Sequence, residues 1–272
     1  NSTLTDRYFL AEQGFSALLE VEEGKVLFDL GYSDVFLKNA RKMDETLLDL
    51  THVVLSHGHL DHTWGLVHLI MTLTEAEIEK RSYLRPDSIA HPDVFFTKRS
   101  GGTLPESGSL LSEEKCREQF RLVLSEKPMW LSKDLVFLGE IPRRYAFESP
   151  EPARKLCRNG ILEPDRMADD SALVWRGEDG LVVITGCSHS GICNIVAYAR
   201  EVCREEQIQD IIGGFHLLHA TDDRLNAIVA TLTTLGVSRM HPCHCTGFQA
   251  RRRLSEAFFV EEVGSGLVCE YT

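Results

Sequence analysis

Short apolar runs separated by glycine and polar residues dominate the first part of the chain. Phe15–Val21 and Lys25–Leu30 flank a Glu-Glu-Gly turn, and Leu50–Ser56 is a third run with Val-Val-Leu at its centre. Runs of this length, rich in strand formers, are typical of β-strands. We expect a short helix over Asp34–Met43 and a longer one from Trp64 to about Leu73.

The second half of the chain alternates between strand-like and helix-like patterns. Ala172–Trp175 and Leu181–Thr185 flank a turn with two glycines, which indicates a hairpin. The other predicted elements are helix Ile192–Cys203, strand Asp210–Ile212, helix Asp222–Leu235, strand Val237–Met240 and helix Gly247–Phe258. This alternation predicts an α/β layered fold.

The pattern loosens between residues 92 and 152, where prolines and glycines are frequent. We interpret this stretch as an insertion or lid with strands near Arg121–Leu124 and Asp134–Leu138. We expect one domain over residues 1–272 that includes it.

Composition narrows the class of protein. The chain has 272 residues, a formal charge of −12 and 43% hydrophobic residues, which is typical of a soluble globular protein. The acidic balance argues against nucleic acid as a partner, and no apolar run is long enough to span a membrane. Eight scattered cysteines favour a reducing, cytoplasmic location. Since no methionine opens the chain, we expect it to begin inside a longer gene product.

Three histidines and an aspartate follow the Leu50–Ser56 strand, as His57, His59, Asp61 and His62. Imidazole and carboxylate are ligands for zinc and related divalent ions. We expect Gly58 to adopt unusual backbone angles that let its two neighbours converge. The alternative is a polar loop whose histidines only form hydrogen bonds.

This motif resembles the His-x-His-x-Asp-His hallmark of the metallo-β-lactamase superfamily. The resemblance implies an α/β (α+β) fold of αββα layers, with two mixed sheets flanked by helices and two metals at one edge. It also implies that His57 and His59 bind the first metal and that Asp61 and His62 bind the second. Asp29, which closes an early strand, would support the metal loop as a hydrogen-bond acceptor.

Later positions depart from the common family pattern. Cys187 stands where many members have a bridging aspartate, and His189 follows two residues later as the candidate for the missing imidazole. His244 is the candidate last ligand, with Cys243 and Cys245 expected to point elsewhere. A Cys-His-Cys zinc knot over residues 243–245 is the competing interpretation. The resemblance leaves open whether Cys187 contacts metal.

Other polar residues near strand ends have two interpretations each. His216 either meets the substrate and transfers protons or is a structural histidine. The basic groups Lys98-Arg99 and Arg143-Arg144 are either phosphate clamps or solvated surface. We expect Asp169-Asp170 to cap the hairpin, with metal binding as the alternative. Arg143 and Glu140 are weaker candidates for substrate binding.

A set of motifs narrows the resemblance to one branch of the superfamily. They are Gly-Glu-Ile-Pro-Arg at 139–143, Asp-Asp-Ser at 169–171, Gly-Cys-Ser-His-Ser-Gly at 186–191, Gly-Gly-Phe-His at 213–216 and His-Cys-Thr-Gly at 244–247. This set resembles the branch named for 7,8-dihydropterin-6-methyl-4-(β-D-ribofuranosyl)aminobenzene-5′-phosphate synthase.

The expected function is a dinuclear metal-dependent hydrolase. A metal-bound hydroxide would attack a small phosphorylated or ester substrate, with Asp61 orienting the nucleophile and His216 meeting the substrate. Zn²⁺ is the expected metal, with Mn²⁺ or Fe²⁺ as alternatives. The rival functions are the pterin synthase, which is a transferase, and a metal or ligand sensor without turnover.

Overall fold

The first sheet is built from the amino-terminal half of the chain. The computed structural model describes residues 2–100, 106–148 and 154–272. The strand order is β1 (Ala17–Val21), β2 (Gly24–Phe28), β3 (Leu50–Val54), β4 (Asp87–Ala90) and β6 (Arg121–Leu124). The pair β1–β2 is antiparallel and the remaining pairs are parallel. The carboxyl ends of β2, β3 and β4 therefore lie at one edge.

The second sheet has seven strands, mostly from the carboxyl-terminal half. In order they are β15 (Phe259–Val260), β14 (Arg239–Cys243), β13 (Ile208–Gly214), β12 (Gly180–Thr185), β11 (Ala172–Gly177), β8 (Leu135–Phe137) and β7 (Met129–Trp130). Strands β12 to β15 are parallel, whereas β7, β8, β11 and β12 pair antiparallel. Both sheets are thus mixed.

Alternate residues of the strands face two different cores. Val26, Phe28 and Val54 from the first sheet meet Phe137 and Ile184 from the second in one buried cluster. Their strand neighbours point outward, into clusters covered by helices. Successive strand side chains point to opposite faces, so a strand buried on both sides is apolar throughout.

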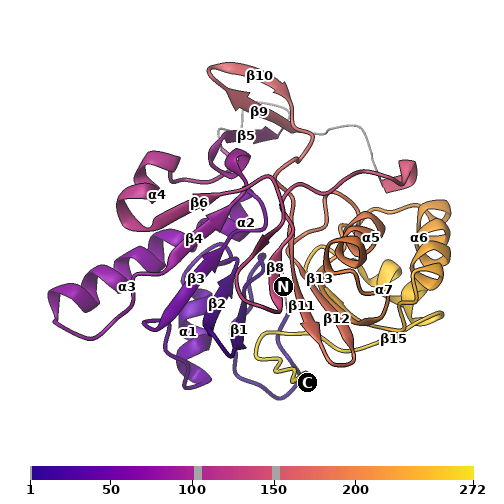
Figure 1. Cartoon of the computed structure of the whole chain (residues 1–272), viewed down its shortest axis with the longest axis horizontal. Helices are drawn as coiled ribbons and strands as arrows, with labels where there is room; N and C mark the ends of the chain where they lie inside the picture. The colour runs from indigo at the N-terminus through magenta and orange to yellow at the C-terminus, as the bar shows by residue number, and fades with distance from the viewer. Residues whose placement is uncertain (1, 101–105, 149–153) are drawn as a thin grey trace.

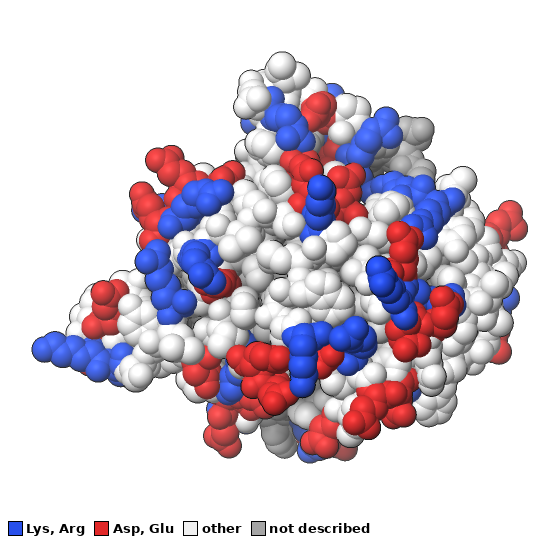
Figure 2. All heavy atoms as spheres, viewed as in Figure 1, with Lys and Arg blue, Asp and Glu red and all other residues white. Residues whose placement is uncertain are grey.

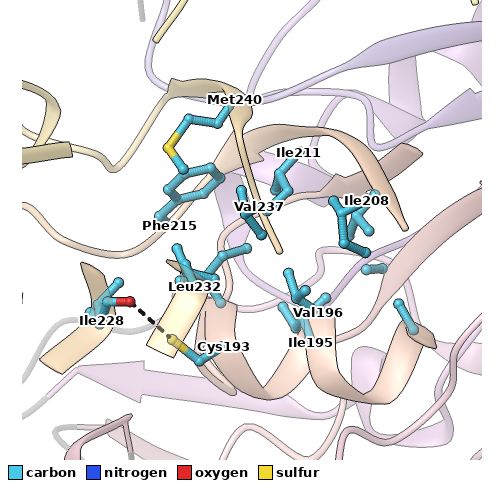
Figure 3. Close-up of a cluster of buried hydrophobic side chains, with 14 of the residues drawn as sticks. Cys193, Ile195, Val196, Ile208, Ile211, Phe215, Ile228, Leu232, Val237 and Met240 are labelled. Carbon is cyan, nitrogen blue, oxygen red and sulfur yellow. Dashed lines mark hydrogen bonds between the residues drawn. The ribbon is translucent and has the colours of Figure 1, made fainter. Parts of the chain in front are cut away.

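Helices cover the outer face of each sheet. The first sheet is covered by α1 (Val35–Lys42), α3 (Leu66–Ile78) and α4 (Glu113–Gln119), and the second by α5 (Ile192–Cys203), α6 (Asp222–Thr234) and α7 (Phe248–Ser255). Figure 1 shows the two sheets side by side between these helix layers. Figure 3 shows the core between the second sheet and its helices, where Leu232 of α6 packs in one cluster with Phe215 and with Met240 of β14. The predicted αββα sandwich is confirmed.

A small third sheet lies above the sandwich in Figure 1. It consists of β10 (Ile161–Pro164), β9 (Arg154–Arg158) and β5 (Thr97–Ser100), all antiparallel. The 3₁₀ turn η1 (Pro92–Phe95) precedes β5, and the 3₁₀ turn η2 (Ala146–Glu148) precedes β9. A further short helix, α2 (Leu60–Thr63), lies between β3 and α3. The stretch expected to be an insertion also supplies β6, β7 and β8 to the two main sheets.

Several predicted boundaries are wrong, and two elements illustrate why. The helix expected from Trp64 to Leu73 begins at Leu66 and continues to Ile78, after the separate turn α2. The strand expected over Val237–Met240 is β14, which runs to Cys243. In both cases the apolar pattern identifies the element but not its end.

No helix of the described residues has the length and apolar character required to cross a membrane. On the face in Figure 2, acidic and basic side chains are interspersed.

Phe137 offers a test of the packing between the sheets, because its side chain is fully buried there. Replacing it with alanine should lower the free energy of unfolding by about 3–5 kcal/mol, since a cavity would remain. Urea denaturation measures this change. Phe259→Ala is the matched control, because Phe259 is 64% exposed, and it should change stability by less than about 0.5 kcal/mol. Equal losses in the two variants would contradict this packing.

Candidate metal centre

Polar side chains gather where strands of both sheets end. Asp29 follows β2, His57 follows β3, Cys187 follows β12, His216 follows β13 and His244 follows β14. Because β2 and β3 are parallel, and β12 to β14 are also parallel, each set of loops lies at one edge of its sheet. The structure brings the two edges together.

The first ligand group consists of His57, His59 and His189, each of which offers a ring nitrogen within 4.8 Å of the others. His57 Nε2 lies 3.0 Å from His59 Nδ1. The His189 ring centroid is 4.8 Å from that of His57 and 4.7 Å from that of His59. The two sheets therefore contribute to one cluster.

The second ligand group consists of Asp61, His62 and His244. His62 Nε2 lies 3.2 Å from His244 Nε2, and Asp61 Oδ2 lies 3.5 Å from His244 Nε2. The ring centroids of His57 and His62 are 4.2 Å apart, so the two groups are adjacent. All six residues that the sequence indicated as metal ligands thus lie together, and their coordination of metal stays a prediction.

Asp29 connects the strand ends to both histidine groups. Its Oδ1 accepts a hydrogen bond from the Ser56 amide at 2.7 Å, and its Oδ2 accepts one from the Ser56 hydroxyl at 2.6 Å. Oδ2 also lies 2.6 Å from His62 Nδ1, and Ser56 Oγ lies 2.8 Å from His57 Nδ1. Each imidazole donates its Nδ1 proton outward in this arrangement, which turns Nε2 toward the centre.

Two glycines are required for close approach at this point. A Cβ on Gly58 would lie 2.3 Å from the Val94 carbonyl oxygen, and one on Gly186 would lie 2.6 Å from Asp29 Oδ2. The expectation that Gly58 needs unusual backbone angles is wrong, because it is not among the positive-φ glycines of the described residues. The constraint on Gly58 is space.

A buried ion-pair network holds the loop of His57 and His59 on the side away from Asp29. Lys98 Nζ lies 2.8 Å from Asp169 Oδ1 and 3.1 Å from Asp165 Oδ2, and all three side chains are buried. The other oxygen of Asp169 accepts the Gly58 amide at 2.7 Å. Burial lowers the pKa of Lys98, but the two carboxylates outweigh it and raise that pKa overall. Lys98 is therefore neither a phosphate clamp nor solvated surface.

The expectation that Asp169-Asp170 caps the hairpin is also wrong. Asp170 accepts hydrogen bonds from the amide and hydroxyl of Ser190, at 2.8 and 2.5 Å. The hairpin turn lies at the other end of β11, at Gly177–Gly180. Asp169 holds the His57–His59 loop, while Asp170 holds the loop that carries His189. No sequence pattern indicates these pairings, because the partners are far apart in the chain.

The electrostatics of the centre keep the three imidazoles of the first ligand group neutral, whereas His62 differs. Burial, together with neighbouring imidazoles, lowers the pKa values of His57 and His189 well below their usual range. Burial and the charge of Arg154 lower the pKa of His59 in the same way. Burial also lowers the pKa of His62, but Asp29 raises it to about 9 overall. His62 Nε2 therefore carries a proton, which it donates to His244 Nε2 at 3.2 Å.

The donor set fits divalent metal ions. Neutral imidazoles and a carboxylate are the ligands that such ions prefer. The Nε2 atoms of His59 and His189 are buried, and neither has a hydrogen-bond partner among the described residues. A buried polar atom without a partner is costly. A bound cation, which accepts the lone pair of the imidazole nitrogen, would offset that cost.

Cys187 and Cys245 add two thiols between the ligand groups. Their Sγ atoms are 3.1 Å apart, and Cys187 Sγ lies 3.6 Å from His216 Nδ1. Burial raises the pKa of Cys245, but hydrogen bonds from the Cys187 thiol and from His216 lower it to about 6 overall. The expectation that Cys245 points elsewhere is wrong. Cys243 belongs to no ligand group of the described residues, so residues 243–245 do not form the expected knot, but Cys187, His244 and Cys245 form a further group there.

The candidate substrate residues have different surroundings. His216 is exposed, and its ring centroid is 4.2 Å from that of His189, at the open side of the cluster. Arg143 is occupied, since its guanidinium donates to the carbonyl oxygens of His189, Arg166 and Met167. Glu140 is exposed. Of these three residues, only His216 packs its side chain against the side chain of a candidate ligand, His189.

Several loop residues at the centre have strained backbones. Asp29, Ser188, His216 and His244 all have φ values between 51° and 56°. Such conformations cost about 1–3 kcal/mol each and persist where the surroundings impose them. At Asp29, the hydrogen bonds from Ser56 and the contact with His62 hold this conformation.

Comparison with known proteins matches this arrangement. A sequence profile described as the metallo-beta-lactamase superfamily matches residues 10–125. A protein of Methanocaldococcus jannaschii named 7,8-dihydropterin-6-methyl-4-(beta-D-ribofuranosyl)-aminobenzene-5'-phosphate synthase is 33% identical over 92% of this chain and 86% of its own. The chain belongs to the metallo-beta-lactamase superfamily.

Two further proteins are similar to this chain over nearly its whole length. An uncharacterized protein of Methanocaldococcus jannaschii is 33% identical over 91% of this chain and 89% of its own. The crystal structure of Tm1679, described as a metal-dependent hydrolase of the beta-lactamase superfamily, is 32% identical. That similarity has a TM-score of 0.82 and covers 100% of this chain and 96% of the other.

The raised pKa of His62 predicts a pH-dependent affinity for metal. Because this pKa is about 9, the imidazole carries a proton at pH 7.5 that must leave when a metal binds. Metal affinity should therefore increase as the pH rises from 7 to 9. Calorimetric titration of the metal-free protein with Mn²⁺, in buffers of different ionisation enthalpy, measures the released protons.

Asp29→Asn is the matched control for this titration. It keeps the size of the side chain but removes the charge that raises the pKa of His62, so it should release about one proton fewer at pH 7.5. Equal proton release from the two proteins would contradict the assignment.

Proposed function

We propose that the protein is a dinuclear metal-dependent hydrolase that acts on a small phosphorylated or ester substrate. The observation that carries the proposal is the pair of adjacent ligand groups, one of His57, His59 and His189 and one of Asp61, His62 and His244. When bound, two divalent ions lower the pKa of a water molecule and neutralise charge on the reacting oxygens. Zinc is the proposed metal, with manganese or iron as alternatives.

The protein's own residues have separate roles in this proposal. Asp61 holds the second metal position and orients the attacking water, since its carboxylate borders His244. His216 meets the substrate at the exposed side and transfers a proton. Asp29 positions His62 through their 2.6 Å contact. The superfamily relative described as a metal-dependent hydrolase supports this proposal.

The pterin synthase is a second candidate, favoured by the 33% identical relative that carries that name. In that case the same residues would bind a pterin and its diphosphate leaving group. A protein that binds metal or ligand without turnover is the outcome if neither reaction occurs.

One set of assays separates these functions. The protein is incubated with phosphomonoesters, phosphodiesters, lactones and carboxylic esters in the presence of Zn²⁺, Mn²⁺ or Fe²⁺. In parallel, a dihydropterin diphosphate is incubated with an aminobenzene riboside phosphate. Hydrolysis supports the proposal, and condensation alone replaces it with the synthase. If neither reaction proceeds with any metal, the protein is a binding protein.

His59→Ala tests whether the ligand groups hold the metal. Wild-type protein should contain about two ions per chain by elemental analysis, and the variant should contain at least one fewer. Mutating a residue that supports a metal ligand typically lowers activity by roughly 10–100-fold. Because His59 is itself a proposed ligand, the activity of the variant should fall by more than this. His219→Ala is the matched control, because His219 is exposed and belongs to neither ligand group. Equal metal content in all three proteins would contradict the assignment.

His216→Gln tests proton transfer separately from metal binding. The variant should keep its metal content, and kcat should fall by about 10²–10⁴-fold, as for the loss of a general acid or base. One limb of the pH profile of kcat/KM should disappear. A lower kcat with an unchanged profile would instead indicate a positional role.

A further inference from the structure

The small sheet of β5, β9 and β10 covers the loop that carries His57 and His59. Lys98, on β5, pairs with Asp169, whose other oxygen holds the Gly58 amide. A Cβ on Gly58 would lie 3.0 Å from Lys98 Cε. The side of the small sheet to which Lys98 points is therefore the side that faces His57 and His59.

Arg154 lies on that inner side. Lys98 and Leu156 are direct partners in the antiparallel pair β5–β9, so their side chains point to the same face, and both are buried. Because side chains alternate along a strand, Arg154 shares the face of Leu156, about 7 Å further along. Lys155 and Arg99 occupy the outer face and are exposed. Arg154 is half-buried.

The backbone of Arg154 is fixed to the network that supports the metal loop. Its carbonyl oxygen accepts a hydrogen bond from the Asp165 amide at 2.9 Å, and Asp165 pairs with Lys98. This bond fixes Arg154 at the end of the small sheet that is tied to the Lys98 network, on the face that covers the loop of His57 and His59.

The other basic candidates around the centre are committed elsewhere. Lys98 is buried between two carboxylates, and Arg143 donates to three carbonyl oxygens. Arg144 pairs with Glu201. On β9 itself, Arg158 pairs with Asp93 and Glu163, whereas Arg154 forms no ion pair with any acidic side chain in residues 2–100, 106–148 and 154–272.

We propose that Arg154 binds an oxyanion group of the substrate, a phosphate or a carboxylate, beside the first ligand group. This inference rests on the proposed function and narrows the substrate to an anionic one. A guanidinium forms paired hydrogen bonds with such groups, which orients them as well as attracting them. In a chain with a net charge of −12, a cation at this position also offsets the repulsion of an anionic substrate.

Binding of inorganic phosphate and of acetate tests the proposal without requiring turnover. Both are titrated calorimetrically into protein purified with its own metal. Arg154→Ala should weaken binding of the preferred anion by about 10–100-fold, the range expected for a charge-assisted pair. Arg154→Lys should restore part of the affinity. Lys155→Ala removes the same charge from the outer face of β9 and should change binding less than twofold.

The outcomes separate this proposal from the proposed function. Arg154-dependent binding in a protein with no hydrolytic activity supports the oxyanion site and counts against the hydrolase. Preference for phosphate or for acetate names the anion. Equal effects of Arg154→Ala and Lys155→Ala, or no anion binding by the wild type, would overturn the assignment of Arg154. Unchanged metal content and melting temperature in Arg154→Ala exclude loss of the centre as the cause.

If the protein hydrolyses esters, substrate choice gives a second readout. Arg154→Ala should lower kcat/KM for an anionic substrate while leaving that for a neutral ester within about twofold, because the lost interaction involves the substrate's charge. Equal losses for the two substrates would contradict a role in oxyanion recognition.

Discussion

The buried carboxylate of Asp29 is the interaction on which the centre depends. It accepts two hydrogen bonds from Ser56 and orients His62, so the ends of β2 and β3 and the turn α2 become one unit. Gly186 brings the second sheet against the same carboxylate, where no side chain would fit. A buried charge of this kind is tolerated because each of its oxygens has partners. Among the ligand histidines it contacts His62 directly and reaches His57 through the Ser56 hydroxyl.

A second set of buried charges restrains the same loop from outside the sandwich. Lys98, Asp165 and Asp169 link the small sheet to the Gly58 amide. Buried ion pairs of this type contribute little net stability but specify position, since removing one partner leaves the others unpaired. The loop from His57 to His62 is thus fixed by Asp29 on one side and by Asp169 on the other. That rigidity suits a candidate centre whose imidazoles lie close together, as His57 Nε2 and His59 Nδ1 do at 3.0 Å.

The sequence predicts the fold and the candidate ligand groups better than it predicts the residues that support them. The motif from His57 to His62 follows a strand that is apolar on both faces, and local spacing is enough to identify it. Asp29 and His244 could be predicted because the superfamily resemblance assigns positions after strands. Lys98 and Asp169 could not, because they are 71 residues apart and pair only through the third sheet. Cys245 was misassigned because β14 ends at Cys243, so strand alternation no longer applies to the residues that follow.

The central claim is that two metal ions occupy two adjacent ligand groups. Anomalous diffraction from crystals grown with zinc, collected on both sides of the zinc absorption edge, tests it most directly. The account predicts two peaks about 3.5–4 Å apart, one bounded by His57, His59 and His189 and the other by Asp61, His62 and His244. A single peak held by Cys187, His244 and Cys245 would contradict it, because the histidine groups would then not be the metal sites.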